Sequence, residues 1–222
     1  MIPLRDVIPS RTTPIVTIGL ILVNTVVFLY EMTLSDQELR RLLRQHGLVS
    51  ASATPLAVIT SMFLHGGPLH VTGNLLYLWI FGDNVEDRLG HDRFLVFYLL
   101  CGASATATQV LVSPQSQVPV VGASGAIAGV LGAYLVMFPQ SRVLTLVPLV
   151  FLVQIVEVPA LVLLAIWFLF QLLLGLGSLA TAGAGHGGSI AFWAHAGGFA
   201  AGMALVSLFR RRERDRVEWW GA

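Results

Sequence analysis

The chain is poor in charge. Only 11% of its 222 residues are charged, whereas a soluble domain usually carries roughly a quarter. Two long stretches, residues 94–141 and 158–209, contain no Asp, Glu, Lys or Arg. A membrane-spanning helix needs about 20 predominantly apolar residues, so each stretch is long enough to cross a bilayer twice. A large soluble core would need charged outer faces, which these stretches lack. The composition therefore predicts an integral, multi-pass membrane protein.

Lysine is absent and cysteine almost so. All 13 cationic side chains are Arg, and the single cysteine, Cys101, excludes an internal disulfide and a Cys-rich metal cluster. Cys101 lies in an apolar run, where we expect a packing role. We expect no metal, no cofactor and no nucleic-acid partner.

Six apolar runs predict six membrane-spanning helices. Their approximate ranges are 14–31, 69–82, 94–112, 122–138, 158–176 and 191–209. The first run could be a signal peptide, but no small-residue cleavage site follows it, so we interpret it as an uncleaved span. The predicted fold class is all-α: a compact bundle of six transmembrane helices that forms one domain of residues 1–222.

Three connecting segments have distinctive compositions. Residues 36–46 are polar with leucines on one face, which predicts a short helix at the membrane surface. Residues 143–157 are apolar but contain Pro148 and end at Glu157, and counting them as a span would give seven crossings. We therefore expect a partly inserted connector there. The Gly-rich, uncharged loop 178–189 is a candidate lid.

The arginines predict the orientation. Short Arg-rich flanks remain in the cytoplasm, so both termini should be cytoplasmic. In this arrangement the cytoplasmic segments carry ten Arg and the outer loop after the first span carries three. The expected location is the cell (inner) membrane of a bacterium or archaeon. The second, fourth and sixth spans then begin on the outer side.

Polar residues gather at the beginnings of these three spans. The second begins with His70 and Asn74, the fourth with Gly122-Ala123-Ser124-Gly125, and the sixth with Ala194-His195. Polar groups inside apolar spans are costly and usually face the protein interior. A Ser-Gly pair is by itself more often a helix-packing surface, as is the four-residue spacing of the glycines that follow. Packing does not explain why four polar side chains share one depth.

Serine protease chemistry explains that placement. A serine hydroxyl becomes nucleophilic beside a base, and imidazole has a suitable pKa near neutral pH. Ser124 and His195 would be these partners, brought together by glycine-mediated packing of the fourth and sixth spans. The oxyanion then needs donors, which Asn74, His70 and the Ser124 backbone N–H can supply. No Asp or Glu lies in these span ends, so we predict a dyad.

The motifs resemble those of the rhomboid family of intramembrane serine proteases. Gly122-Ala123-Ser124-Gly125 is similar to the family's Gly-x-Ser-Gly. Ala194-His195 with Gly198 and Gly202 is similar to its Ala-His-x-x-Gly-x-x-x-Gly, and His70-Val71-Thr72-Gly73-Asn74 to its His-x-x-x-Asn. The resemblance covers the whole six-span unit, and three motifs in this order are highly specific.

The resemblance implies a function for each motif. It implies a Ser124–His195 dyad, an oxyanion pocket with His70 and Asn74, and cleavage of transmembrane segments near their outer ends. The partners would be transmembrane protein substrates and the lipid bilayer. His65 resembles a further family histidine, for which we expect a structural role. Two features depart from the family: the outer loop has no Trp, and Ala128 stands where some relatives carry a Tyr that packs on the catalytic histidine.

The sequence lacks the signatures of other intramembrane proteases and of transporters. The chain has no His-Glu-x-x-His for a zinc protease, and its only Asp residues near spans lie in or beside one charged stretch, residues 83–93. A transporter or channel would place paired charges or broken helices near the bilayer midplane. The alternative left open is a catalytically inert rhomboid-like protein that binds transmembrane clients without cutting them.

Overall fold

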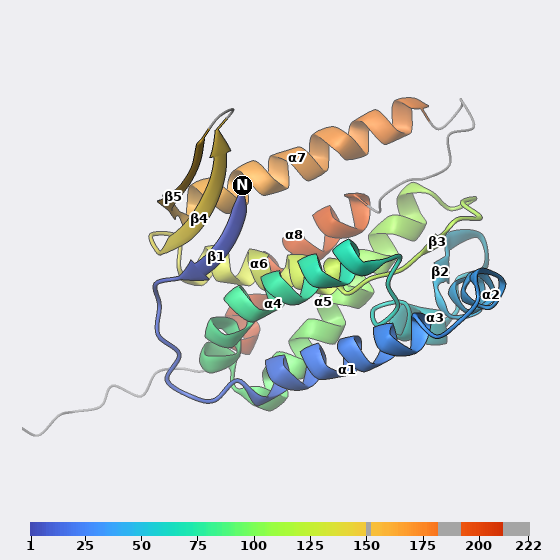
Figure 1. The fold of residues 1–222 in the computed structure, drawn as a ribbon, viewed down its shortest axis with the longest axis horizontal. Coiled ribbons are helices and arrows are strands. Elements are labelled where there is room, and N and C mark those ends of the chain that lie inside the picture. The colour runs from blue at the N-terminus through green and yellow to red at the C-terminus, as the bar shows by residue number, and fades with distance from the viewer. Residues whose placement is uncertain (150–151, 182–191, 211–222) are drawn as a thin grey trace, which may run out of the picture.

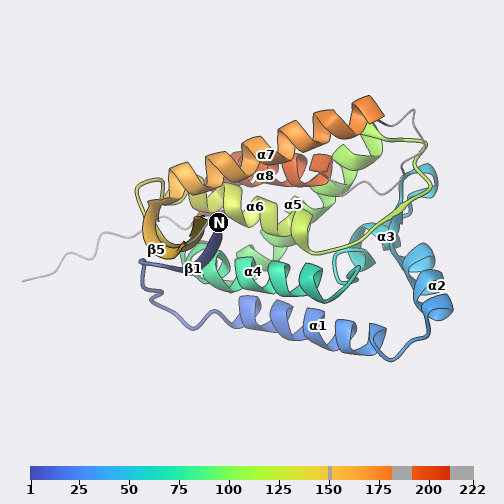
Figure 2. The same ribbon diagram turned by 45° about the horizontal axis from the view of Figure 1, so that its top comes forward.

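A computed structural model describes residues 1–149, 152–181 and 192–210. Six helices occupy the six predicted apolar runs and lie side by side (Figures 1 and 2). They are α1 (Ile15–Glu31), α4 (Pro68–Leu89), α5 (His91–Val112), α6 (Ser124–Met137), α7 (Ala160–Thr181) and α8 (Phe192–Phe209).

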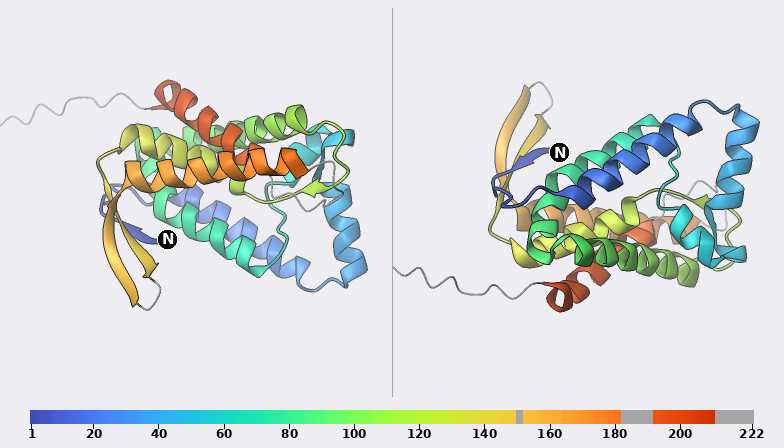
Figure 3. Two further views of the ribbon diagram at one scale, coloured as in Figure 1. Left: turned by 90° about the horizontal axis from the view of Figure 1, so that it is seen from above. Right: turned by 90° about the horizontal axis from the view of Figure 1, so that it is seen from below.

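The mostly helical, membrane-protein character is confirmed. Among the described helices, α5, α7 and α8 are long and apolar enough to cross a membrane, and α1 and α6 are apolar but shorter. The count of six spans and the cytoplasmic placement of the termini stay predictions. Within the bundle, the N-terminus and the end of α8 lie at the same end, while α4, α6 and α8 begin at the other (Figure 3).

Short elements cover the end of the bundle at which α4, α6 and α8 begin. The predicted surface helix is present as α2 (Asp36–His46), followed by the 3₁₀ turn η1 (Ser50–Ser52) and α3 (Pro55–Thr60). A capping box starts α2: the Ser35 hydroxyl accepts from the Glu38 N–H, and the Glu38 carboxylate accepts from the Ser35 N–H. The two-stranded sheet of β2 (Leu48–Val49) and β3 (Pro119–Val120) joins this region to the segment before α6.

A three-stranded sheet at the opposite end corrects the all-α prediction. Its order is β1 (Ile2–Asp6), β4 (Arg142–Leu149) and β5 (Leu152–Pro159), with both pairings antiparallel. Of residues 143–157, predicted to be a partly inserted connector, the described residues 143–149 and 152–157 therefore lie in the paired strands β4 and β5. This segment is rich in β-branched residues, which suit a half-buried pleated surface, and pairing satisfies the backbone groups that Pro148 would leave unpaired in a helix.

The charged stretch after residue 82 is helical, which corrects the predicted end of the second run. Helix α4 continues to Leu89, and Gly90, with φ of 82°, makes the turn into α5. The Glu86 carboxylate is fully buried and accepts the N–H groups of Val16 (2.9 Å) and Thr17 (2.7 Å) at the start of α1. A carboxylate satisfies unpaired N–H groups and complements the dipole at a helix N-terminus. These contacts with α1 compensate the burial of Glu86, so α4 can carry this charged residue inside the bundle.

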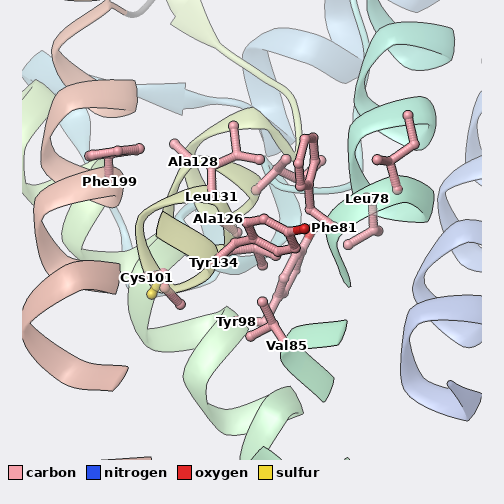
Figure 4. Close-up of a cluster of buried hydrophobic side chains, with 14 of the residues drawn as sticks. Leu78, Phe81, Val85, Tyr98, Cys101, Ala126, Ala128, Leu131, Tyr134 and Phe199 are labelled. Carbon is pink, nitrogen blue, oxygen red and sulfur yellow. The ribbon is translucent and has the colours of Figure 1, made fainter. Parts of the chain in front are cut away.

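Helix α6 lies at the centre of the core. Its buried residues pack with side chains of α4, α5 and α8, including Phe81, Tyr98 and Phe199 (Figure 4). Cys101 is buried in this cluster, as a packing residue would be. A Cβ on Gly198 would overlap the Gly125 carbonyl. The backbones of α6 and α8 thus touch, as the glycine spacing predicted.

Candidate active site

A cavity of about 840 Å³ between α4, α6 and α7 is lined by all four predicted site residues. His70 and Asn74 reach it from the first turns of α4, Ser124 from the start of α6, and His195 from the first turn of α8. Residues from three separate helix beginnings thus meet in one concave space. A cavity with a few convergent polar groups is the usual form of a binding or reaction site.

Ser124 and His195 are hydrogen-bonded. The Ser124 Oγ lies 2.7 Å from the His195 Nε2, although 71 residues separate them in the chain. The close contact of α6 and α8 makes this approach possible, because Cβ atoms at Gly198 and Gly202 would push the helices apart. Ser124 is also the first residue of α6, where a backbone N–H has no partner within the helix.

Gly122 forms the turn that leads the chain into Ser124 and α6. Its φ of 123° is strained for any residue with a side chain, and a Cβ there would lie 2.7 Å from the His70 ring. The Gly122 N–H donates to the Ser61 carbonyl at 2.8 Å, which fixes the turn. Glycine is therefore required here by both backbone conformation and space.

His70 and Asn74 carry donors that face the same space. The Gly66 N–H donates to the His70 Nδ1 at 3.3 Å, so the proton of the neutral ring belongs on Nε2, which lies beside Gly122. The Asn74 Nδ2 is buried without a hydrogen-bond partner among the described residues. An unpaired buried amide is costly, which is expected where a ligand supplies the missing acceptor.

His65 lies behind this pair of donors. Its ring packs edge-on against His70 with 5.2 Å between centroids, and its side chain is 1% exposed. The His65 backbone N–H donates to the buried Glu31 carboxylate at 3.1 Å. These contacts tie the segment before α4 to the end of α1.

A rhomboid-domain family model matches residues 53–212, which contain all four site residues. The chain belongs to the rhomboid family. One similar rhomboid, Rhomboid protease GluP of Bacillus subtilis (strain 168), is 40% identical over 85 residues, which cover 38% of this chain and 16% of GluP. Presenilin-associated rhomboid-like protein A, mitochondrial, of Danio rerio is 31% identical over 136 residues, which cover 60% of this chain and 35% of that protein. Rhomboid protein 1, mitochondrial, of Saccharomyces cerevisiae is 30% identical over 96 residues, which cover 41% of this chain and 28% of that protein.

The matched segments span at most about a third of each of these rhomboid relatives. The relatives include a bacterial protein and mitochondrial proteins. Of the candidate lid of this rhomboid, residues 178–181 belong to α7 and the remainder lies outside the described residues.

The sequence missed two side chains on α7 of this rhomboid. The Gln171 Oε1 lies 2.7 Å from the His195 Nδ1, and the Trp167 ring lies 6.0 Å from the His195 ring. The sequence predicts a dyad without a group that orients His195, because no Asp or Glu lies in the span ends. Gln171 is the only amide in the apolar run 158–176, and the cost of a polar group in a span could have identified it.

Trp167 supplies an aromatic neighbour for His195, although Ala128 stands where some relatives carry a Tyr. That alanine is buried inside the core cluster (Figure 4) and carries no ring that could pack on His195. The indole of Trp167 instead lies beside both His195 and Phe199, with 6.0 Å between ring centroids in each case. In this rhomboid the aromatic neighbour of the histidine comes from α7.

Proposed function

We propose that the protein is an intramembrane serine endopeptidase that cleaves transmembrane segments near their outer ends. The observation that carries this proposal is the 2.7 Å contact between the Ser124 Oγ and the His195 Nε2 in a cavity of a membrane protein. A neutral Nε2 accepts the hydroxyl proton while Oγ attacks the substrate carbonyl. His195 then donates that proton to the leaving amine, and the carbonyl carbon stays bound to Oγ as an acyl-enzyme. A water molecule, activated by the same imidazole, hydrolyses the ester.

Donors on α4 support the same mechanism. The tetrahedral intermediate places a negative charge on the former carbonyl oxygen, and donors aimed at that position lower the barrier. The His70 Nε2 side of the ring faces Gly122, and the Asn74 Nδ2 is buried and unpaired among the described residues. Together with the N–H of Ser124 at the start of α6, they form the proposed oxyanion pocket.

The substrate follows from the site's form. A hydrogen-bonded helix hides its carbonyls from a nucleophile, so the cleaved segment must unwind locally at its outer end. Gly66, Gly73 and Gly122 lie around the site, which favours small residues at the cleaved bond. We further propose one domain with six spans, both termini in the cytoplasm and a location in a bacterial or archaeal cell membrane. The site would then face the outer side.

A fluorophosphonate probe tests the nucleophile. We expect the purified protein to be labelled covalently, and Ser124→Ala to abolish both labelling and cleavage of a single-span reporter substrate. Ser207→Ala, on the exposed side of α8, is the matched control and should label like wild type. Labelling that persists in Ser124→Ala would remove Ser124 from this role, and complete absence of labelling in the wild type would favour the inert, client-binding alternative.

The base is tested separately. His195→Ala should lose at least about 10³-fold in turnover, because the hydroxyl no longer has a proton acceptor. Its thermal unfolding in detergent should remain cooperative. Wild-type turnover in this variant would mean that another group acts as the base.

A further inference from the structure

We propose that Gln171 is a positioning residue that holds His195 in the tautomer and orientation needed to accept the Ser124 proton. The inference rests on the proposed protease function and extends it to a third member, from α7. The three side chains form a continuous chain: Oε1 of Gln171 to Nδ1 of His195 at 2.7 Å, and Nε2 of His195 to Oγ of Ser124 at 2.7 Å.

The two hydrogen bonds require one tautomer. A neutral imidazole has one N–H and one bare nitrogen, so Nε2 can accept the Ser124 proton only if the ring proton is on Nδ1. That proton needs an acceptor, and the Gln171 Oε1 is at hydrogen-bonding distance. The carbonyl end of the amide therefore selects the reactive form of His195, in the way that a carboxylate does in a three-residue site.

Trp167 strengthens the same geometry. It lies four residues before Gln171, so the two side chains share one face of α7. Its ring is tilted by 36° to the His195 ring at 6.0 Å and lies equally close to Phe199, one turn further along α8. Gln171 fixes the ring through a nitrogen and Trp167 limits its rotation, so α7 supplies both contacts.

An amide differs from a carboxylate in one measurable way. A neutral acceptor orients the imidazole without stabilising its protonated form, whereas a carboxylate would stabilise the imidazolium strongly. Among the described residues that line the cavity, the titratable side chains other than His195 are His70 and Tyr77, both from α4. No carboxylate lines the described part of the cavity, so one introduced at residue 171 should dominate the pH response.

Two substitutions separate positioning from packing. Gln171→Leu keeps a similar volume but removes the acceptor, so the rate constant for fluorophosphonate labelling should fall about 10- to 100-fold, as on losing a group that orients a reactive histidine. Gln171→Glu restores an acceptor, so labelling at high pH should return to within a few-fold of wild type. In the pH profile of the labelling rate, the acid limb of Gln171→Glu should move to higher pH by about one unit or more. The introduced carboxylate stabilises the protonated imidazole, which is inactive as a base. A purely structural role of Gln171 would not move that limb.

The controls distinguish this inference from the proposed function. Leu173→Ala changes an exposed side chain of α7 and should label at the wild-type rate. If Ser124→Ala is inert but Gln171→Leu labels like wild type, positioning by Gln171 is wrong and the protease proposal stands. If Ser124→Ala still labels, the protease proposal itself fails. Should Gln171→Leu fold poorly, the pH profile of Gln171→Glu decides, since an unshifted acid limb contradicts the inference.

Discussion

Single donor groups at the edge of the cavity are placed by their neighbours. The Gly66 N–H directs the His70 ring, and helix α4 carries Asn74 one turn later on the same face. Both donors line the same cavity as Ser124, and in the proposed mechanism they would form a preorganised oxyanion pocket. At the scale of the residue, the proposed site combines the donors of His70 and Asn74 with one acceptor, the His195 Nε2.

Removal of a donor should affect turnover more than binding. We expect Asn74→Ala to lower kcat by about 10²- to 10³-fold with little change in KM, because the bond strengthens as charge develops. The control is Thr72→Ala, an exposed residue of the same turn, which should behave like wild type. The measurement is steady-state cleavage of a reporter transmembrane substrate in detergent. A change confined to KM would show that Asn74 binds substrate and does not stabilise the oxyanion.

At the scale of elements, the contact between α6 and α8 brings Ser124 and His195, the proposed nucleophile and base, together. The four-residue spacing of glycines on both helices lets the backbones touch, and small residues serve this purpose in membrane helices. Helix α7 joins the pair through Trp167, Phe168 and Gln171, whose partners are His195 and Phe199 on α8. The Ser124–His195 hydrogen bond thus depends on helix packing.

Glycine substitutions should separate close packing from helix propensity. A Cβ at Gly202 would overlap the Gly129 carbonyl, so Gly202→Ala should destabilise the protein by about 1–3 kcal/mol and reduce activity. Gly19 in α1 has open space around it, so Gly19→Ala should be neutral or stabilising by up to about 1 kcal/mol. Thermal unfolding midpoints in detergent give the comparison. Equal midpoints for both variants would contradict the close contact of α6 and α8.

At the scale of the whole molecule, Asp6 joins the sheet to the helices. Its carboxylate accepts from the Tyr134 hydroxyl of α6 at 2.7 Å and from the Asn84 amide of α4 at 2.9 Å. Burial raises the pKa of Asp6 to about 6, against the opposing effect of the Tyr134 hydrogen bond and with the help of the nearby Asp83 charge. The folded state therefore favours the protonated acid.

Stability should consequently depend on pH. A carboxyl whose pKa rises on folding stabilises the protein below its unfolded pKa, near 4, and this contribution is lost as pH rises to about 6. We expect the thermal midpoint to rise when pH is lowered from 7.5 to 5, and to rise less in Asp6→Asn. Equal shifts in both proteins would show that other groups cause the dependence.

The proposed topology is also testable on the whole molecule. Gln37 on α2 and Pro9, in the segment between β1 and α1, are exposed. Helix α2 and the segment between β1 and α1 lie at opposite ends of the bundle (Figure 1). In intact cells, a membrane-impermeant maleimide should label Gln37→Cys, whereas Pro9→Cys should be labelled only after permeabilisation. The wild type is the blank, because its single cysteine, Cys101, is buried. The opposite pattern would invert the orientation inferred from the arginines.

By itself, the sequence determined the membrane class, the positions of six helices and the four polar residues that meet in the cavity. It could do so because lack of charge over about 20 residues and polar groups inside apolar runs are local signals. The family motifs are equally local, and the match over residues 53–212 agrees with them. The end of the second helix was predicted least well, because the buried Glu86 carboxylate accepts hydrogen bonds from the start of α1.

Only the tertiary structure decided which side chains of α7 contact His195 and which strands pair with β4. Gln171 is uncharged and lies 24 residues from His195, so its role depends on how α7 packs against α8. The sheet likewise pairs β4 with a strand at the N-terminus, and Asp6 meets Tyr134 across 128 residues. Such contacts have no local signature, because they arise from the path of the whole chain.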